Sequence, residues 1–540
     1  MQYTKGSTTI SKKILCLVLA LLSAAIMVGC NIDSLPGATE TPPITAIPSE
    51  SISMPTDGHL KVSMPLRPDS LNPLDAVTAE MVSLLSLVYE TPIKLGANGE
   101  LSPSLFTKWE KQPDGSYLFS LREEVAWHNG TVLSADDIIY TLEQIQQRAT
   151  EGTPCIYTEC LSQIQSYEKT QDGALRILPK NGLVLLLYTL NFPVLPQGDS
   201  AGSLPVGTGP YRVTSYTPEA SMELSFHQEW WHSTPSITQI SALCMKDSSA
   251  ASSAFENGDI HLLYADEINA ATYKQGGVNT LREVPTLYYD YLALNFSHPN
   301  LANKTIRQAL AYSLDKTALI TRAYSNHAVA ADWPMLPGSY LSDIRYTYTP
   351  ANSKEIHSLL ASAGYEDRNQ DGILENASMQ PLSFSILVQS DVLNTSMTDM
   401  ADAIQRQLEH TGFDITIEAV SYSDYTGRLN ARDFDLALVS TYRSNTPDLS
   451  PFLASGGPLN FGSYFDTEMS ALLRAASAAD ESDFQGAMQS VQKKFVQDLP
   501  HISLCFKTRS LLHHQSLQGI NELLDPTIFN EIHTWYILDN

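Results

Sequence analysis

Apolar and polar positions alternate, or apolar residues run together, in several short stretches of the chain. In Leu60–Met64 every second residue is apolar, which is the pattern of a strand with one buried face. Leu183–Tyr188 and Phe434–Val439 are mainly apolar runs of strand length. We therefore predict strands at all three places.

Other stretches carry apolar residues at helical spacing. Val77–Glu90 and Leu301–Tyr324 both repeat apolar residues every three or four positions, which predicts helices with one buried face. A further helix is predicted after Ser134, because a serine followed by aspartates suits a helix N-terminus. Strands and helices interleave without a short repeat. This pattern predicts an α/β fold of two or more lobes and excludes solenoids and propellers.

The N-terminus has the features of an export signal. Lysines precede an apolar stretch, Ile14–Val28, which is too short for a membrane span and suits a signal peptide. The stretch ends at Gly29 and Cys30, which resemble a bacterial lipobox, where the cysteine receives the lipid. We predict that residues 1–30 are a lipoprotein signal peptide with its lipidation site at Cys30. A plain signal peptide that contains a cysteine is the alternative.

Residues 31–57 are rich in Ser, Thr and Pro and poor in bulky apolar residues. Such a segment buries too little surface to order itself, so we predict a disordered tether between the lipid and the folded part. Folded sequence is predicted to begin near His59.

Charge narrows the possible partners. The 540 residues contain 33 Lys and Arg against 59 Asp and Glu, a net charge of −26. Removal of residues 1–29 deletes three lysines and no acidic residue, which moves the net charge to −29. Such a surface repels nucleic-acid phosphates and anionic lipid headgroups, so neither is predicted as a partner.

Metal sites and cofactors are not predicted. Cys155 and Cys160 lie close together in the sequence, and either a structural disulfide or buried free thiols would fit them. There is no CxxC pair and no zinc-like Cys/His spacing. Asp367–Gly372 begins like a calcium loop, but Ser378 stands where such loops have their bidentate glutamate. A turn braced by side chains is the prediction there.

Five stretches occur in the order in which one protein family has them. They are Leu71–Leu74 with Leu87–Glu90; Asp114–Tyr117 with Val125–Trp127 and Leu133–Asp137; Pro205–Tyr211 upstream of Trp230–Trp231; Leu294–Asn295 with Ile306–Lys316; and Pro447–Leu449 with Phe452–Leu453. On these motifs the chain resembles the family 5 extracellular solute-binding proteins, which include the oligopeptide- and dipeptide-binding proteins of ABC importers. The resemblance covers most of residues 60–515.

The motifs themselves have mainly structural interpretations. Asp114–Gly115 suits a hairpin turn, since glycine supplies the positive φ. Gly207–Pro210 is glycine-rich like a phosphate loop but lacks the lysine, so a tight turn is predicted instead. We expect Arg307 to anchor its helix on a carboxylate or on carbonyls, and Asp315 to cap a helix.

The resemblance implies an α/β, two-lobed periplasmic-binding-protein-like fold of type II, in the large cluster with an extra subdomain and a hinge between the lobes. Lobe I would comprise residues 58–92, 205–293 and 509–540, and lobe II residues 294–508. The extra subdomain on lobe I would comprise residues 93–204.

The implied function is that of a substrate-binding lipoprotein of an ABC importer. It would capture a small solute, expected to be a short peptide, and deliver it to a permease with ATPase subunits. The chain would be a monomer, not an enzyme, and anchored by lipid to the cell membrane on its extracellular or periplasmic side. The alternatives are the same fold binding a nickel chelate, haem or an oligosaccharide, or acting as a sensory or surface lipoprotein.

Two segments match the family's ligand-facing loops. They supply the candidate ligand-binding residues Val77, Thr78, Ala79, Glu80, Tyr442, Arg443, Ser444, Asn445 and Asp448. In peptide-binding relatives the second segment carries an aspartate four residues before a proline, and this aspartate pairs with the peptide's amino group. Here Arg443 stands at that position. An arginine repels an ammonium group and attracts a carboxylate.

Three interpretations of this exchange stay open. The ligand has no free amine, or a peptide is held by another acid such as Asp448 or Glu80, or Arg443 points away from the site.

Overall fold

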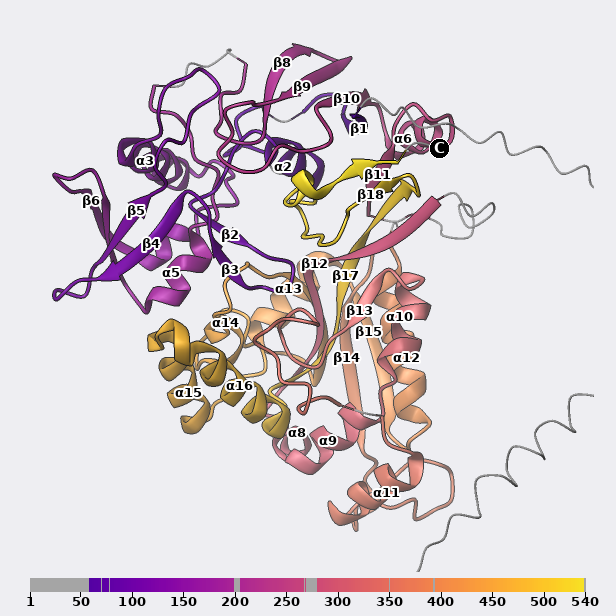
Figure 1. Ribbon diagram of the computed structural model, residues 1–540. Coiled ribbons are helices and arrows are strands. Elements are labelled where there is room, and N and C mark those ends of the chain that lie inside the picture. Colours follow the sequence, from indigo (N-terminus) through magenta and orange to yellow (C-terminus); the bar gives the residue numbers. More distant parts are fainter. Residues whose placement is uncertain are drawn as a thin grey trace, which may run out of the picture. The chain divides into compact units, whose positions relative to one another are not determined.

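A computed structural model of the chain describes residues 58–68, 70–76, 78–198, 204–266, 268, 279–348, 350–391 and 394–538 (Figure 1). The predicted signal peptide with Cys30, the predicted tether and Val77 lie outside these residues. The described part belongs to one compact unit, residues 52–540. None of its described helices is long and apolar enough to cross a membrane.

The first lobe is built on a four-stranded sheet of order β1-β10-β9-β8. Its strands are β1 (His59–Pro65), β8 (Tyr211–Thr217), β9 (Ser221–Phe226) and β10 (Gln239–Met245). Alternate residues of β1 are buried, which confirms the strand predicted at residues 60–64. Helix α6 (Ser248–Glu256) follows β10, and α2 (Ala79–Leu85) packs near β1.

Helix α2 is shorter than the helix predicted for residues 77–90, and the glycine motif explains why. The carbonyls of Leu87 and Val88 accept hydrogen bonds from the N–H groups of Tyr211 and Gly209, at 3.0 and 2.9 Å, so they leave the helical pattern. A Cβ at Gly207 would lie 1.8 Å from the Val88 carbonyl oxygen. The motif at residues 207–210 therefore serves close backbone packing, in keeping with the predicted tight turn.

A second four-stranded sheet, of order β4-β5-β7-β6, forms the extra subdomain. Its strands are β4 (Phe106–Lys111), β5 (Tyr117–Leu121), β6 (Ile164–Lys169) and β7 (Leu175–Pro179), with α3 (Ala135–Glu151), α4 (Cys160–Gln163) and the short pair β2 (Ile93–Leu95) and β3 (Leu101–Pro103). Gly115 has φ +86° between β4 and β5, which confirms the predicted hairpin turn. Ser134 caps α3 in a capping box with Asp137, as predicted for this N-terminus.

Helix α5 (Leu183–Thr189) stands where a strand was predicted, and that prediction was wrong. All seven of its residues are buried, so its apolar run shows neither the helical nor the strand period. Leu183 and Leu186 belong to the core shared by lobe I and the subdomain. Val184 and Tyr188 belong instead to a core of lobe II. The helix is apolar all round because it is enclosed on both sides.

Lobe II and the connection between the lobes share a seven-stranded sheet with the path β11-β17-β12-β16-β14-β15, on which β13 also pairs with β17. The strands are β11 (Leu262–Ala265), β12 (Asn279–Leu294), β13 (Ala328–Ala330), β14 (Ser383–Gln389), β15 (Asp414–Val420), β16 (Leu436–Tyr442) and β17 (His501–His514). Strand β16 confirms the strand predicted at residues 434–439, with a later start. Figure 1 shows α10 (Lys316–Tyr324) and α12 (Ser396–Glu409) beside β14 and β15.

The long strands β12 and β17 connect the lobes. Their antiparallel register runs from the pair Asn279–His514, beside β11, to the pair Ala293–His501, deep in lobe II. It shifts between Pro285 and Tyr289 and again between Asp290 and Tyr291. A register shift bends a strand pair locally. The two lobes are therefore joined by a continuous sheet with an irregularity between them, as the predicted hinged, two-lobed α/β fold requires.

The helix predicted for residues 301–324 is divided into α8 (Pro299–Ala302), α9 (Lys304–Tyr312) and α10. Asp315 caps α10 by accepting from the Ala318 N–H at 3.1 Å, as predicted. The Arg307 guanidinium donates to the carbonyls of Leu301, Ala302 and Asp498, which confirms its anchoring role.

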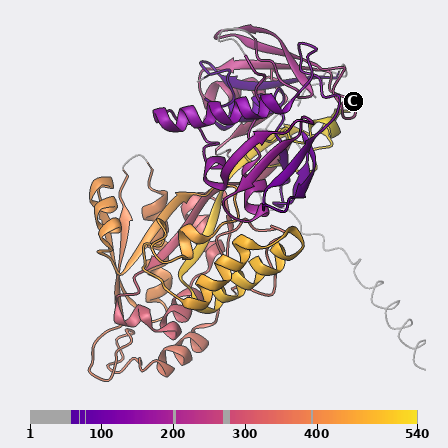
Figure 2. The same ribbon diagram turned by 90° about the vertical axis from the view of Figure 1, so that its left-hand side faces the viewer.

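The remaining helices of lobe II are α11 (Ser353–Ser362), α13 (Tyr422–Ala431), α14 (Ser450–Leu453), α15 (Thr467–Ala478) and α16 (Glu481–Asp498). The paired gold helices in Figure 2 are α15 and α16. The predicted braced turn is present, since the Asp367 carboxylate accepts from the N–H groups of Gln370 and Gly372. The chain ends with β18 (Leu517–Gln518), the short helix η1 (Ile532–Thr534) and β19 (Tyr536–Ile537), and Trp535 is buried in the lobe I core.

Candidate ligand-binding site

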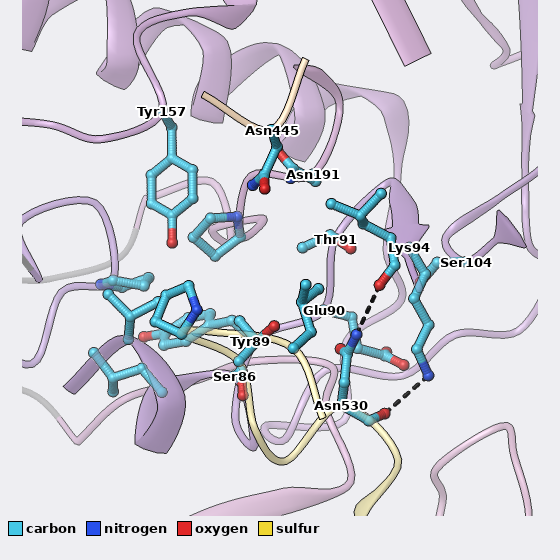
Figure 3. Close-up of a pocket in the computed structure, with 18 of the residues that line it drawn as sticks. Ser86, Tyr89, Glu90, Thr91, Lys94, Ser104, Tyr157, Asn191, Asn445 and Asn530 are labelled. Atoms are coloured by element: carbon cyan, nitrogen blue, oxygen red, sulfur yellow. Dashed lines mark hydrogen bonds between the residues drawn. The ribbon is translucent and has the colours of Figure 1, made fainter. Parts of the chain in front are cut away.

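A cavity of about 760 Å³ lies between residues of lobe I, the extra subdomain and lobe II. Five segments contribute most of its wall: residues 82–91, 155–160, 230–232, 442–445 and 524–533. Figure 3 shows Tyr89, Glu90, Tyr157 and Asn445 around this space. Because these segments are far apart in the sequence, only the folded chain assembles the site.

The aromatic wall on lobe I is braced by Glu90. The indole N–H groups of Trp230 and Trp231 both donate to its carboxylate at 3.0 Å. The Arg122 guanidinium lies 3.7 Å above the Trp231 ring. Burial raises the pKa of Glu90, and the hydrogen bonds from the two indoles oppose this rise. The carboxyl group thus holds the rings in place, and the rings offer a ligand flat apolar surfaces.

Next to this wall, charged and imidazole groups lie together. The Lys94 ammonium donates to the Asn530 carbonyl at 2.8 Å, as Figure 3 shows. It also donates to the Glu531 carboxylate at 2.5 Å. The ring centroids of His232 and His533 are 4.5 Å apart. Burial lowers the pKa of both imidazoles. Within the described residues no group of three or more His, Cys, Asp or Glu side chains is arranged to hold a metal ion.

The segment 155–160 meets lobe II across the cavity. The Thr446 hydroxyl donates to the Glu159 carboxylate and also contacts the Ser444 hydroxyl at 2.6 Å. The cysteines of this segment, Cys155 and Cys160, are free thiols. Burial raises the pKa of both, that of Cys160 to about 12. Both groups are therefore protonated near neutral pH and are poor nucleophiles.

Three of the five candidate residues of the second predicted loop line the cavity, whereas Arg443 and Asp448 do not. Tyr442, Ser444 and Asn445 line it. Asp448 instead accepts from the Ser450 N–H at 2.8 Å, at the start of α14. Tyr442 is 53% exposed, and burial of its hydroxyl raises its pKa to about 12. The aromatic ring is thus available to a ligand.

The candidate residues of the first predicted loop are placed at the start of α2, and they are not part of the cavity wall. The Thr78 hydroxyl accepts from the Met81 N–H at 3.4 Å, so Thr78 caps the helix. Ala79 is buried, and Glu80 lies in the first helical turn. Val77 is outside the described residues. The part of this helix that reaches the cavity is the later part, at Val82, Leu85 and Ser86.

Arg443 directly follows β16 and does not line the large cavity. Its backbone N–H donates to the Leu287 carbonyl at 2.8 Å, where the register of β12 shifts. Its side chain is 5% exposed, and one amino group donates to the Thr446 carbonyl at 3.0 Å. Burial lowers its pKa to about 10, so the guanidinium still carries its charge at neutral pH. It lines a small cavity of about 40 Å³ that shares Tyr188, Ser444 and Asn445 with the large one.

Sequence reasoning missed the segments 155–160 and 524–533 as parts of the site. Neither segment contains a motif whose residue spacing indicates a chemical function. The periodicity of apolar residues does not predict which loops come together in the folded chain. The only available signal for this wall was the pair Trp230–Trp231, which was noted as a family motif but was not assigned to the site.

Two lobes joined by shared strands, with a cavity lined from both, define a two-lobed solute-binding protein. The chain belongs to the bacterial extracellular solute-binding proteins of family 5: the family described as "Bacterial extracellular solute-binding proteins, family 5 Middle" matches residues 100–462. The family predicted from the sequence motifs is therefore confirmed, as is the fold class.

Individual relatives are distant but cover most of the chain. The oligopeptide-binding protein AppA of Bacillus subtilis is 24% identical over 499 residues, which are 87% of this chain and 89% of that protein. The dipeptide-binding protein of Escherichia coli is 23% identical, over 72% of this chain and 77% of that protein.

Solved structures share the fold at lower identity. The unliganded open form of the murein tripeptide-binding protein MppA has a TM-score of 0.75 at 17% identity, over 90% of this chain and 98% of that one. A nickel ABC transporter structure from Bacillus halodurans has a TM-score of 0.74 at 20% identity, over 86% of this chain and 96% of that one.

Proposed function

We propose that this chain is the substrate-binding component of an ABC importer, which captures a short peptide or a similar small solute between its lobes and delivers it to a permease with ATPase subunits. The observation that carries this proposal is the cavity of about 760 Å³ lined from both lobes. Cavities of roughly 300–1,000 Å³ suit small ligands. Family membership and the peptide-binding relatives support it.

The mechanism is closure of the lobes over the ligand. Lobe I and lobe II each have a buried core, and α5 of the subdomain also packs against a core of lobe II, so closure moves the two lobes about this contact. The strands β12 and β17 connect the lobes, and residues 286–288 at the register shift are the proposed hinge. Closure excludes water from the ligand, and the closed form presents a surface that the permease can distinguish from the open one.

The proposed division of the chain places residues 58–92, 205–293 and 509–540 in lobe I, 93–204 in the subdomain and 294–508 in lobe II. Tyr442, Ser444 and Asn445 are the proposed ligand contacts. Thr78 and Asp448 act indirectly, by fixing the starts of helices α2 and α14.

The proposed location is the outer side of the cell membrane, with a lipid on Cys30 and residues 31–57 as the tether. Support comes from the basic, apolar and Gly-Cys order of the leader. Two or more acyl chains hold a protein firmly at a membrane. Globomycin treatment should accumulate a larger precursor that keeps residues 1–29, and Cys30→Ala should abolish incorporation of labelled palmitate. Unchanged labelling of the Cys30→Ala variant would contradict the anchor.

A metal chelate is the second candidate ligand. It is favoured by the adjacent rings of His232 and His533, 4.5 Å apart in the cavity wall. Two imidazoles could complete the coordination of a metal whose other positions are filled by a chelator.

Calorimetric titration with a tripeptide library, and in parallel with nickel–histidine, haem and oligosaccharides, tests the function. Binding of one class should release heat, and small-angle X-ray scattering should show a smaller radius of gyration with it. The Asn445→Trp variant should fill the cavity and weaken binding more than about tenfold. Tyr422→Trp, at a residue 66% exposed on α13, is the matched control. No heat and no compaction with any class would refute the proposal.

A further inference from the structure

Arg443 is a buried cation whose charge is not neutralised by an ion pair. Its guanidinium donates to one carbonyl, that of Thr446, and no ion pair within the described residues includes it. The charges that favour its protonation, including those of Glu159 and Asp448, act from a distance. An arginine presents several N–H donors in a fixed fork, and a carbonyl of this kind uses only part of them.

The guanidinium lines a small cavity of suitable size and chemistry for an anion. Its volume of about 40 Å³ has room for roughly three water-sized groups, which is the size of a carboxylate. Arg443 is the charged side chain in its wall, and the described lining includes no acidic residue. The remaining wall combines apolar groups such as Leu287 and Met335 with polar ones such as Asn98 and Ser339. An anion in the small cavity would be attracted by the Arg443 guanidinium and would not be repelled by any acidic residue of the described lining.

The two cavities are neighbours, and they differ in charge. Tyr188, Ser444 and Asn445 belong to the walls of both, so the two cavities are adjacent. The large cavity is lined by four acidic residues and one lysine: Glu90, Glu159, Asp525, Glu531 and Lys94. A ligand with a carboxylate at one end and a neutral or cationic remainder would match both parts of the space.

We infer that the small cavity beside Arg443 is the carboxylate subsite of the ligand-binding cleft, so that the solute is held by its acid end at the lobe II side. This inference rests on the proposed function for the identity of the ligand, and on the geometry for the subsite. Bidentate pairing of a guanidinium with a carboxylate is a strong, directional contact, and its strength rises away from water. The subsite thus selects the solute by an acid group and leaves the rest of the ligand free to vary.

The subsite can be tested without knowledge of the ligand. Protein labelled with ¹⁵N-arginine is titrated with sodium acetate, and with acetamide as the neutral probe of the same shape. The Arg443 Nε–H resonance, assigned by its loss in Arg443→Lys, should shift saturably with acetate and not with acetamide. Equal responses to both probes, or no response to acetate, would overturn the subsite.

A second measurement connects the subsite with peptides. A tripeptide library with free carboxyl ends should bind at least about tenfold more tightly than the same library amidated at the C-terminus. Arg443→Met should remove this preference, whereas Arg322→Met, at a side chain 57% exposed on α10, should keep it. Equal binding of both libraries by the unaltered protein would overturn the inference while the proposed function stands. Acetate binding without any peptide binding would support the subsite and reject the peptide.

Discussion

Two arginines of lobe II, Arg307 and Arg443, are equally buried, but their guanidinium groups differ in how completely they are hydrogen-bonded. Each is 5% exposed. Arg307 donates to three carbonyls through four hydrogen bonds and lies 4.6 Å above the Phe296 ring. Arg443 donates to one carbonyl and faces a cavity. Burial of a charge alone therefore does not distinguish the two, whereas the unused donors of Arg443 are what the proposed carboxylate subsite requires.

The largest expected effect is on stability at the satisfied arginine. Arg307→Met leaves the carbonyls of Leu301, Ala302 and Asp498 without their donor in a buried setting. We expect a loss of about 4 kcal/mol in the free energy of unfolding, since each unsatisfied buried group costs roughly 1–3 kcal/mol. Urea denaturation followed by circular dichroism measures it. A loss below that of an ordinary surface change would remove the contrast between the two arginines.

A smaller effect is expected on the pH dependence of stability, through the buried histidine His501, which stays neutral in the folded protein. His501 contacts the Tyr289 hydroxyl at 3.0 Å, and burial lowers its pKa to about 3. The unfolded chain binds a proton below about pH 6.5, and the folded protein does not, so stability falls as the pH drops from 6.5 towards 3. Between pH 6.5 and 4 this group should remove about 3 kcal/mol.

The check for His501 is the difference between variants. Denaturation of His501→Asn at both pH values should show a fall in stability that is smaller by that amount. His410→Asn, at the C-terminal cap of α12, is the control. Equal pH dependence of both variants would show that the buried imidazole is not the group responsible.

The smallest expected effect is on the stability of the ligand-free protein at Arg443. Arg443→Met in the ligand-free protein should change the free energy of unfolding by less than about 1 kcal/mol, in either direction. An unpaired buried charge contributes little to stability, and an apolar side chain of similar length can replace it. Denaturation of ligand-free protein measures this. A loss as large as that of Arg307→Met would show that Arg443 supports the fold instead of waiting for a ligand.

Much of the scaffold could be predicted from local chemistry. Alternation at Leu60–Met64, the cap at Ser134 and the turn at Gly115 act within a few residues, so the sequence displays them directly. Helix α5 could not be assigned in this way, because a run of apolar residues has no visible period. Its enclosure between two cores arises from tertiary packing, which the local sequence does not show.

The site was predicted only in part, for a related reason. The loop with Tyr442, Ser444 and Asn445 was indicated by the family motifs around Pro447, and it lies at the cavity. Glu159 and the segment 524–533 reach the same space through contacts across several hundred residues, which a single sequence does not encode locally. The exchange at Arg443 was visible in the sequence, but the small cavity beside it was not.

The cavity wall consists largely of loop segments, whereas the packing that maintains each lobe lies elsewhere. Substitutions in such a wall change which ligands fit the cavity without unfolding the two lobes. Evolution can therefore redirect this scaffold to new nutrients through a handful of changes, and overall similarity between two such chains is a weak guide to their cargo.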